Sequence, residues 1–315
     1  MSFYPCELHC HTIHSDGDFT PAELLQNAKD EGYSLIASTD HNTFSAADEM
    51  KTGVLPFIKG IEWTTYFGHM LVLGINKFID WRDAVPDNID VKIKECKESG
   101  ALVGIAHPFQ LGSPMCTGGR WEFNVKSWDN VDYIEIWHES FSPDNFENRN
   151  ALNMWYSLLD RGYHIACTYG RDWHRHYKAA HFGCTYLDID SAINEKNAID
   201  AVKNGRTVVS SGAKFFMIAK KGSLIRRIGD TLEEGKYTLS FYTDEYARDK
   251  YGKGEFEYEE IRLVTNERKT VLNLKPDAKG AEAQLISGHW YVGELWGKYN
   301  SEPCLLAVTS PIYCK

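Results

Sequence analysis

The chain has 315 residues, of which 43% are hydrophobic and 25% charged, a composition typical of a globular protein with a sizeable buried core. Its formal net charge of -10 argues against general nucleic-acid binding. No apolar run approaches the ~20 residues of a membrane-spanning helix and no signal-like stretch follows Met1, so we expect a cytoplasmic protein without a membrane partner. The eight cysteines include no CxxC pair, and we expect buried or free thiols.

Strand-like and helix-like segments alternate through the first two thirds of the chain. Thr20 can cap a helix, Pro21 suits its first position, Glu23 completes a capping box, and Gly32 ends it. This alternation predicts an α/β fold with a mostly parallel sheet or barrel. The predicted strands cover residues 5–11, 33–39, 55–61, 70–75, 101–106, 133–137 and 165–169, and the later helices 90–99, 145–161 and 192–204.

The pattern changes after about Arg206, where strand-like runs follow one another without a strong helix. Such a series predicts an all-β, sandwich-like domain. We therefore expect two domains, residues 1–211 and 212–315, with the boundary near Ser210-Ser211-Gly212. The predicted strands of the second domain cover residues 237–242, 259–264, 290–295 and 305–309.

Side chains of the metal-ligand type recur at the ends of the predicted strands. His9 and His11 stand two apart, so both rings project from the same face, and Asp172 and His174 repeat this spacing. In a parallel barrel all of these strand ends meet at one face. The residues at or just beyond the other strand ends are Asp40, His41, Glu62, His107 and Glu135, and Asp16 lies near the His9–His11 pair.

This set of residues predicts a metal cluster. Imidazole and carboxylate ligands suit zinc, manganese or iron, and eight ligands exceed what one ion needs, so we expect two or three divalent ions. Close-set ions can hold a bridging hydroxide and neutralise the oxyanion that forms as it attacks. A lone histidine at a strand end is more often a hydrogen-bonding residue, and we interpret His138, His164 and His289 in that way.

The chain also resembles the polymerase-and-histidinol-phosphatase (PHP) superfamily over roughly residues 5–190. The resemblance implies a distorted (β/α)7 TIM-like barrel with a two- or three-metal site at the carboxyl ends of its strands. The segments that carry it are His9-Cys10-His11-Thr12, Ser15-Asp16-Gly17, Ser38-Thr39-Asp40-His41, Gly60-Ile61-Glu62, Ala106-His107-Pro108 and Asp172-Trp173-His174.

By this resemblance, eight residues match metal-ligand positions. Glu135 falls where some relatives have a further ligand, with a role as a partner of a ligand as the alternative. His69 matches a histidine that binds the substrate or a third metal. The bulky Trp173 stands where relatives usually have a small residue, so we carry no relative's substrate over to this chain. The eight matching positions are His9, His11, Asp16, His41, Glu62, His107, Asp172 and His174.

Further segments resemble the CehA/McbA-like branch of the superfamily. In that branch the barrel is followed by a β-rich domain, which agrees with the change of pattern after Arg206. The segments are Gly68-His69-Met70, Ile134-Glu135-Ile136-Trp137, Asn204-Gly205-Arg206-Thr207 and Thr309-Ser310-Pro311-Ile312-Tyr313.

Cationic side chains flank the late ligand motif. Arg171, Arg175 and His181 are predicted to bind a substrate phosphate, with an ordinary solvated loop as the alternative. Asp40 or His69 is predicted to orient the nucleophile or protonate the leaving group.

These features favour a metal-dependent phosphoesterase that acts on a small-molecule phosphate ester through a metal-bridging hydroxide, and we expect the site to accept a bound phosphate. Two alternatives remain open. One is a carbamate, amide or ester hydrolase that uses the same cluster. The other is a non-catalytic metal-binding scaffold. No sequence feature predicts an oligomeric state.

Overall fold

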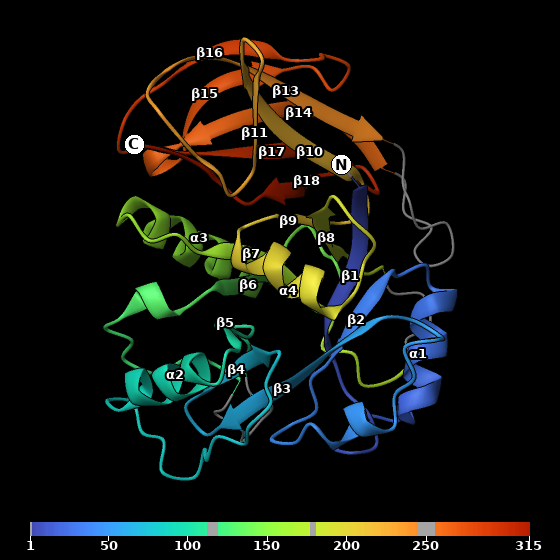
Figure 1. Ribbon diagram of the computed structural model, residues 1–315. Coiled ribbons are helices and arrows are strands. Elements are labelled where there is room, and N and C mark those ends of the chain that lie inside the picture. The colour runs from blue at the N-terminus through green and yellow to red at the C-terminus, as the bar shows by residue number, and fades with distance from the viewer. Residues whose placement is uncertain (1, 112–118, 177–180, 245–255) are drawn as a thin grey trace.

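The computed structural model describes residues 2–111, 119–176, 181–244 and 256–315. In Figure 1 the orange and red strands of the C-terminal part lie above the blue-to-yellow N-terminal part. The described α-helices all belong to the N-terminal part. They are α1 (Pro21–Asp30), α2 (Ile89–Glu98), α3 (Phe146–Asp160) and α4 (Glu195–Lys203), and the shorter 3-10 turns are η1 (Ser45–Asp48), η2 (Trp128–Asn130) and η3 (Asn266–Arg268).

The N-terminal strands form one continuous path in the order β9-β8-β1-β2-β3-β4-β5-β6-β7. Neighbours are parallel from β1 to β3 and from β5 to β7, whereas β4 is antiparallel to both β3 and β5. The strands are β1 (Ser2–Cys10), β2 (Leu35–Ser38), β3 (Phe57–Thr65), β4 (Gly68–Leu73), β5 (Leu102–Ile105), β6 (Tyr133–His138), β7 (Ala166–Gly170), β8 (Cys184–Ile189) and β9 (Thr207–Ser210).

The sheet is therefore mixed, where the sequence predicted a mostly parallel one. Only Tyr66 and Phe67 separate β3 from β4, and so short a connection can join antiparallel strands but not parallel ones. The predicted PHP-like α/β architecture fits the observed strand path. The finer prediction of seven β/α repeats stays a prediction, because the described residues form α-helices in only four places.

β1 and β7 are not neighbours in the strand order, but their carboxyl ends come together. The N–H of Trp173 donates to the carbonyl of His9 at 3.0 Å, and the N–H of His11 donates to the carbonyl of Trp173 at 3.0 Å. These bonds join the residues that follow β7 to the end of β1. The ligand-type residues of the His9–His11 and Asp172–His174 segments are consequently neighbours in space.

The C-terminal strands continue the same large sheet and add a second, four-stranded one. β18 pairs with β9, so hydrogen bonds run through the sheet across the predicted boundary at residues 211 and 212. The division into two domains stays a prediction. The strands are β10 (Lys214–Lys221), β11 (Leu224–Arg227), β12 (Thr231–Leu232), β13 (Gly235–Asp244), β14 (Phe256–Thr265), β15 (Lys269–Leu274), β16 (Ala281–Leu285), β17 (Trp290–Tyr299), β18 (Glu302–Thr309) and β19 (Ile312–Cys314).

The structure confirms the predicted helix start at Thr20 and the predicted burial of the cysteines. The N–H of Glu23 donates to the Thr20 hydroxyl at 3.3 Å, and the Glu23 carboxylate accepts the N–H of Thr20 at 2.8 Å, which completes the predicted capping box. The described cysteines are buried, as expected, and Cys116 lies outside the described residues. Among the described helices, none has the length and apolar character needed to cross a membrane.

Candidate metal centre

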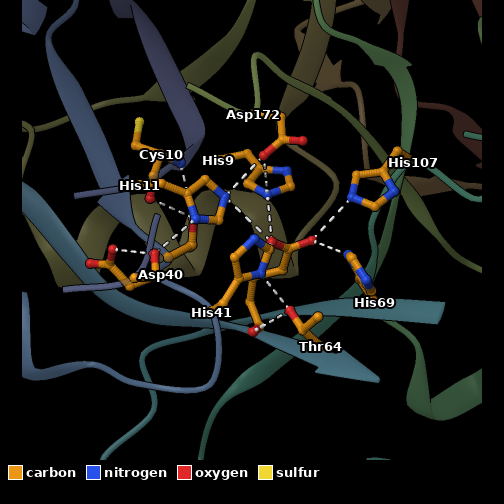
Figure 2. Close-up of polar contacts among 12 residues, drawn as sticks. His9, Cys10, His11, Asp40, His41, Thr64, His69, His107 and Asp172 are labelled. Atoms are coloured by element: carbon orange, nitrogen blue, oxygen red, sulfur yellow. Dashed lines mark hydrogen bonds and ion pairs between the residues drawn. The ribbon is translucent and has the colours of Figure 1, made fainter. Parts of the chain in front are cut away.

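Four side chains from three segments of the sheet meet at the centre of the site. His9 and His11 come from the end of β1, Glu62 from β3 and Asp172 from the turn after β7. His9 Nε2 lies 3.3 Å from Glu62 Oε2 and 3.2 Å from Asp172 Oδ1, and His11 Nε2 lies 3.3 and 2.9 Å from the same two oxygens. Figure 2 shows the His9 and His11 rings and the Asp172 carboxylate turned toward one another.

These four atoms are shielded from solvent, yet none of them has a hydrogen-bond partner of acceptable geometry. Polar atoms buried in this way cost free energy unless something else binds them. Ligands held about 2.1 Å from a single ion lie about 3.0–3.4 Å apart, close to the separations observed here. The two imidazoles and two carboxylates therefore fit one divalent cation.

A second group of ligand-type residues lies on the solvent side of His11. Asp16 Oδ1 is 3.1 Å from His174 Nε2, 3.5 Å from His41 Nε2 and 3.8 Å from His11 Nδ1. The Asp16 side chain is 59% exposed, whereas His11 is fully buried, so this group forms the outer edge of the site. Its atoms lie close enough together to share one metal ion.

A third group, made of His69, His107 and His138, contacts the second oxygens of Glu62 and Asp172. His107 Nε2 lies 3.0 Å from Glu62 Oε1, and His138 Nε2 lies 3.2 Å from Asp172 Oδ2. His69 Nδ1 also contacts Glu62 Oε1, at 2.6 Å. Each carboxylate thus directs one oxygen to the central group and the other to this third group, so each could serve two ions if both groups held one.

His138 lies within the cluster, although its sequence position indicated an ordinary hydrogen-bonding residue. The pairing of β6 with β7 shifts register between Glu135 and Trp137. Such an irregularity changes which face the following side chains occupy. As a result Glu135 and His138, three residues apart, both reach the cluster. The position of His138 at the end of an apolar strand was the signal that could have identified it.

Glu135 acts as a partner of the ligand-type histidines. Its Oε1 lies 3.0 Å from His9 Nδ1, and its Oε2 accepts the backbone N–H of His107 at 2.9 Å. Both oxygens are thereby occupied, and Glu135 lies in none of the ligand groups of the described residues. A Cβ atom at Gly170 would fall 1.6 Å from Glu135 Oε1, so only glycine leaves room for this carboxylate.

Two of the ligand-type residues have unusual backbone conformations. Asp172 has a φ angle of 52° and His107 one of 25°, in the region that side chains other than glycine seldom occupy. Strained residues of this kind persist only where the surrounding structure holds them, and they concentrate at functional sites. In Asp172 the left-handed turn directs the carboxylate inward while Arg171 and Trp173 are buried elsewhere.

The predicted catalytic role of Asp40 is not supported by its contacts. Asp40 Oδ1 accepts the N–H of Thr12 and the hydroxyl of Ser15, both at 2.7 Å, and Oδ2 accepts the Thr12 hydroxyl at 2.9 Å. The carboxylate therefore holds the loop that leads to Asp16. Gly17 closes this loop, because a Cβ there would meet the carbonyl of His11 at 2.6 Å.

Two of the three predicted substrate-binding cations are buried away from the cluster. Arg171 is 2% exposed, pairs with Glu31, and has its guanidinium 3.8 and 3.7 Å from the ring centres of Trp173 and Phe182. His181 is buried and contacts the carbonyl of Ser211. The turn at Asp172 directs the Arg171 side chain away from the neighbouring carboxylate, and a substrate-binding role for Arg171 and His181 stays a prediction. Arg175 is exposed.

The protonation tendencies of the cluster fit cation binding. Burial raises the pKa of Glu62, but the charges of His69 and His9 outweigh it and hold the pKa well below its usual value. Burial likewise lowers the pKa of His107, yet its hydrogen bond with Glu62 raises it to about 9. The hydrogen bond with His174 lowers the pKa of Asp16 to about 2. The ionised carboxylates suit a divalent cation, whereas His107 would have to lose its proton to bind one.

Comparison with known proteins gives a domain match and several partial relatives. Residues 7–100 match the PHP domain family. An uncharacterized protein of Methanocaldococcus jannaschii is 29% identical over 163 residues, which cover 47% of this chain and 88% of that protein. A 3',5'-nucleoside bisphosphate phosphatase of Chromobacterium violaceum is 34% identical over 79 residues, which cover 22% of this chain and 27% of the phosphatase. The likeness to the phosphatase thus spans about a quarter of its length.

Among solved structures, the chain is similar to a two-domain protein of Bacteroides vulgatus that contains a predicted PHP-like metal-dependent phosphoesterase. The TM-score is 0.53 and the identity 18%, with 99% of this chain and 95% of the other covered. At this identity the likeness concerns the fold. The domain match and the clustered ligand-type residues support the PHP superfamily and an enzyme. The CehA/McbA-like branch stays a prediction.

Proposed function

We propose that the protein is a metal-dependent phosphoesterase whose cluster holds two or three divalent ions. The observation that carries this proposal is the convergence of four buried, unpartnered atoms on His9, His11, Glu62 and Asp172. Nothing in the packing of the protein accounts for keeping these atoms together without partners, whereas a cation does.

We assign the proposed ligands in three groups. His9 and His11 hold the central ion together with Glu62 and Asp172, whose second oxygens face the third group. Zinc, manganese and iron all suit this mixture of nitrogen and oxygen donors. Asp16, His41 and His174 make up the outer group. His107 and His138 belong to the third group.

When bound, the ions supply Lewis-acid charge for the phosphoryl oxygens and lower the pKa of water. The chain's own residues then orient and protect the reactants. Glu135 fixes the orientation of His9 through Nδ1, a contact that also sets which ring nitrogen faces the cluster. His69 contacts Glu62 through Nδ1, and we propose that its Nε2 delivers the proton to the departing oxygen.

A phosphate ester is the substrate class we favour. The nucleoside bisphosphate phosphatase and a 5'-3' exoribonuclease of Haemophilus influenzae, 35% identical over 63 residues, both act on phosphate esters by name. Since Arg171 and His181 are buried elsewhere, the metal ions and the exposed Arg175 are left to meet the charge of the phosphate. A small-molecule substrate suits a cluster this deeply enclosed.

Substrate assays combined with metal analysis test the proposal. The purified protein is loaded with manganese or zinc, its metal content is measured, and it is offered phosphomonoesters, phosphodiesters, aryl esters and carbamates. We expect two or three ions per chain and release of phosphate. Activity on carbonyl substrates alone would replace the phosphoesterase with an ester or carbamate hydrolase, and less than one ion per chain without activity would favour a scaffold. His9→Ala is the disabled variant and His289→Ala, outside the cluster, its control.

We also propose that residues 212–315 form a β-rich unit that supports the N-terminal part, as in the CehA/McbA-like branch. Two segments that carry this resemblance lie together. The hydroxyls of Thr207 and Ser310 are 2.6 Å apart, and Ser310 Oγ accepts the N–H of Cys167 in β7 at 3.1 Å. The C-terminal segment thereby supports the strand that leads to Asp172.

A further inference from the structure

Glu7 is a fully buried carboxylate in β1, two residues before His9. Glu7 and Cys10 pair with Ile36 and Ser38, which share one face of β2, so the shift in register places the Glu7 side chain on the face opposite to that of His9. Its Oε1 accepts the backbone N–H of His9 at 3.0 Å and the backbone N–H of Arg171 at 2.8 Å. Glu7 Oε1 therefore accepts hydrogen bonds from the backbone of His9, a proposed ligand, and from the backbone of Arg171, which precedes the proposed ligand Asp172.

The strand pairing explains why these N–H groups need a side-chain acceptor. The register between β1 and β2 shifts between Glu7 and Cys10, so the regular ladder is interrupted where His9 stands. On the other side, β7 ends at Gly170, and Arg171 leads into the left-handed turn at Asp172. Both N–H groups are buried, and a buried N–H without an acceptor costs about 1–3 kcal/mol.

We infer that Glu7 is a positioning residue of the metal centre, which fixes His9 and Asp172 relative to each other through the N–H groups of His9 and Arg171. The inference rests on the proposed function. Ligand atoms must meet within a few tenths of an ångström. His9 lies in β1 and Asp172 follows β7, two strands that are not neighbours in the strand order. The backbone hydrogen bonds of Trp173 with His9 and His11 join the same two segments a second time.

Glu31 provides a matched control for this role. It is also a buried carboxylate beside Arg171, but its contact is with the guanidinium rather than with the backbone that carries a ligand. Replacing Glu31 by Gln removes a buried charge near the cluster and leaves both N–H bonds of Glu7 in place. Replacing Glu7 by Gln keeps an oxygen that can accept both N–H groups, whereas Glu7→Leu keeps the volume and removes the acceptor.

The test measures manganese affinity by calorimetry and metal content after dialysis in the full-length wild type and the variants, with circular dichroism as the check on folding. We expect Glu7→Leu to bind manganese about 10–100-fold more weakly, the loss typical of outer partners of metal ligands. Glu7→Gln is expected to restore affinity to within about threefold of wild type. Glu31→Gln is expected to bind like wild type.

A folded Glu7→Leu with wild-type affinity would overturn the inference, and so would an equal loss in Glu31→Gln. Where Glu7→Leu does not fold, Glu7→Asp replaces it, because the shorter carboxylate keeps the charge but cannot reach both N–H groups. Wild-type affinity in a folded Glu7→Asp would likewise overturn the inference. A wild type that binds manganese but hydrolyses no phosphate ester contradicts the proposed function alone, since the affinities still test Glu7.

Discussion

Two buried polar clusters lie in different parts of this molecule, and they differ in how their atoms are satisfied. At the metal centre, atoms of His9, His11, Glu62 and Asp172 are buried without hydrogen-bond partners. At the contact between α3 and the C-terminal sheet, Glu294 is equally buried, but its oxygens are fully engaged. Oε1 accepts from Tyr156 at 2.7 Å and from Arg268 at 3.1 Å, and Oε2 accepts from Trp296 at 2.7 Å.

The difference separates a structural cluster from a functional one. A satisfied network is complete in itself and stabilises the packing of α3 against the sheet. An unsatisfied one is complete only with a ligand, so it costs stability until that ligand binds. Burial and residue type alone do not distinguish them, because both contain buried carboxylates. The hydrogen-bond partners do.

The strongest test of this contrast exchanges one carboxylate in each cluster for its amide. Glu62→Gln keeps the volume but removes the charge that faces two ligand groups. We expect phosphoesterase activity to fall on the order of 10³-fold, because the bridging position is lost. The matching change, Glu294→Gln, is expected to leave turnover within about twofold, as it lies outside the cluster. Initial rates at saturating metal check both, and similar losses in the two variants would contradict the distinction.

The second test measures the stability of the protein instead of its activity. Glu294→Ala leaves the Tyr156 hydroxyl and the Trp296 indole N–H without their buried acceptor. We expect the free energy of unfolding to fall by about 2–4 kcal/mol, from the lost bonds and the cavity together. Urea denaturation of the metal-free protein measures this. Metal content per folded chain should not change, and a variant that loses metal in proportion to stability would show that the two clusters are coupled.

Removing the metal is the third test. If the cluster is completed by cations, the wild-type protein is stabilised by mass action, by about 2.7 kcal/mol when free metal exceeds the dissociation constant 100-fold. Chelation should lower the melting temperature of the wild type and have little effect on Glu62→Gln. Equal shifts in both proteins would mean that the metal acts elsewhere.

The fourth test concerns the connection between the clusters, which α3 provides. Near its start, Asn148 accepts the N–H of His138 at 2.8 Å, and further along it carries Tyr156. Asn148→Ala is expected to cost about 1–2 kcal/mol and to weaken metal binding about tenfold, because the end of β6 loses its anchor. Calorimetric metal titration checks this. Asn153→Ala, which alters an exposed contact on the same helix, serves as the control.

How far the sequence predicts this site depends on whether a signal is local. The spacing of His9 and His11 and that of Asp172 and His174 are local, and these residues do lie together in the structure. The capping box at Thr20 is local as well. His138 was missed because the irregularity in β6 depends on its pairing with β7, which the sequence of one strand does not reveal.

Roles that depend on side-chain direction were predicted least well. Asp40 follows a strand like the ligand-type residues, yet its oxygens face the loop at Thr12 and Ser15. The mixed sheet has a similar origin, because the alternation of helices and strands gives no sign that β4 inserts between β3 and β5. In the C-terminal part, short strands such as β11 and β12 have too few residues for a two-residue period to be recognised.

Arg175 is the remaining predicted substrate contact, and it gives the smallest expected effect. Its carbonyl accepts the indole N–H of Trp173 at 3.0 Å, which fixes its backbone beside the Asp172–His174 segment, while its side chain is exposed. An exposed cation is screened by solvent and salt, so Arg175→Ala should raise KM for a phosphate ester only about threefold and leave kcat unchanged. The effect should shrink as ionic strength rises. A large fall in kcat would instead place Arg175 at the reacting phosphate, and the separation of an enclosed metal cluster from its solvated rim would need revision.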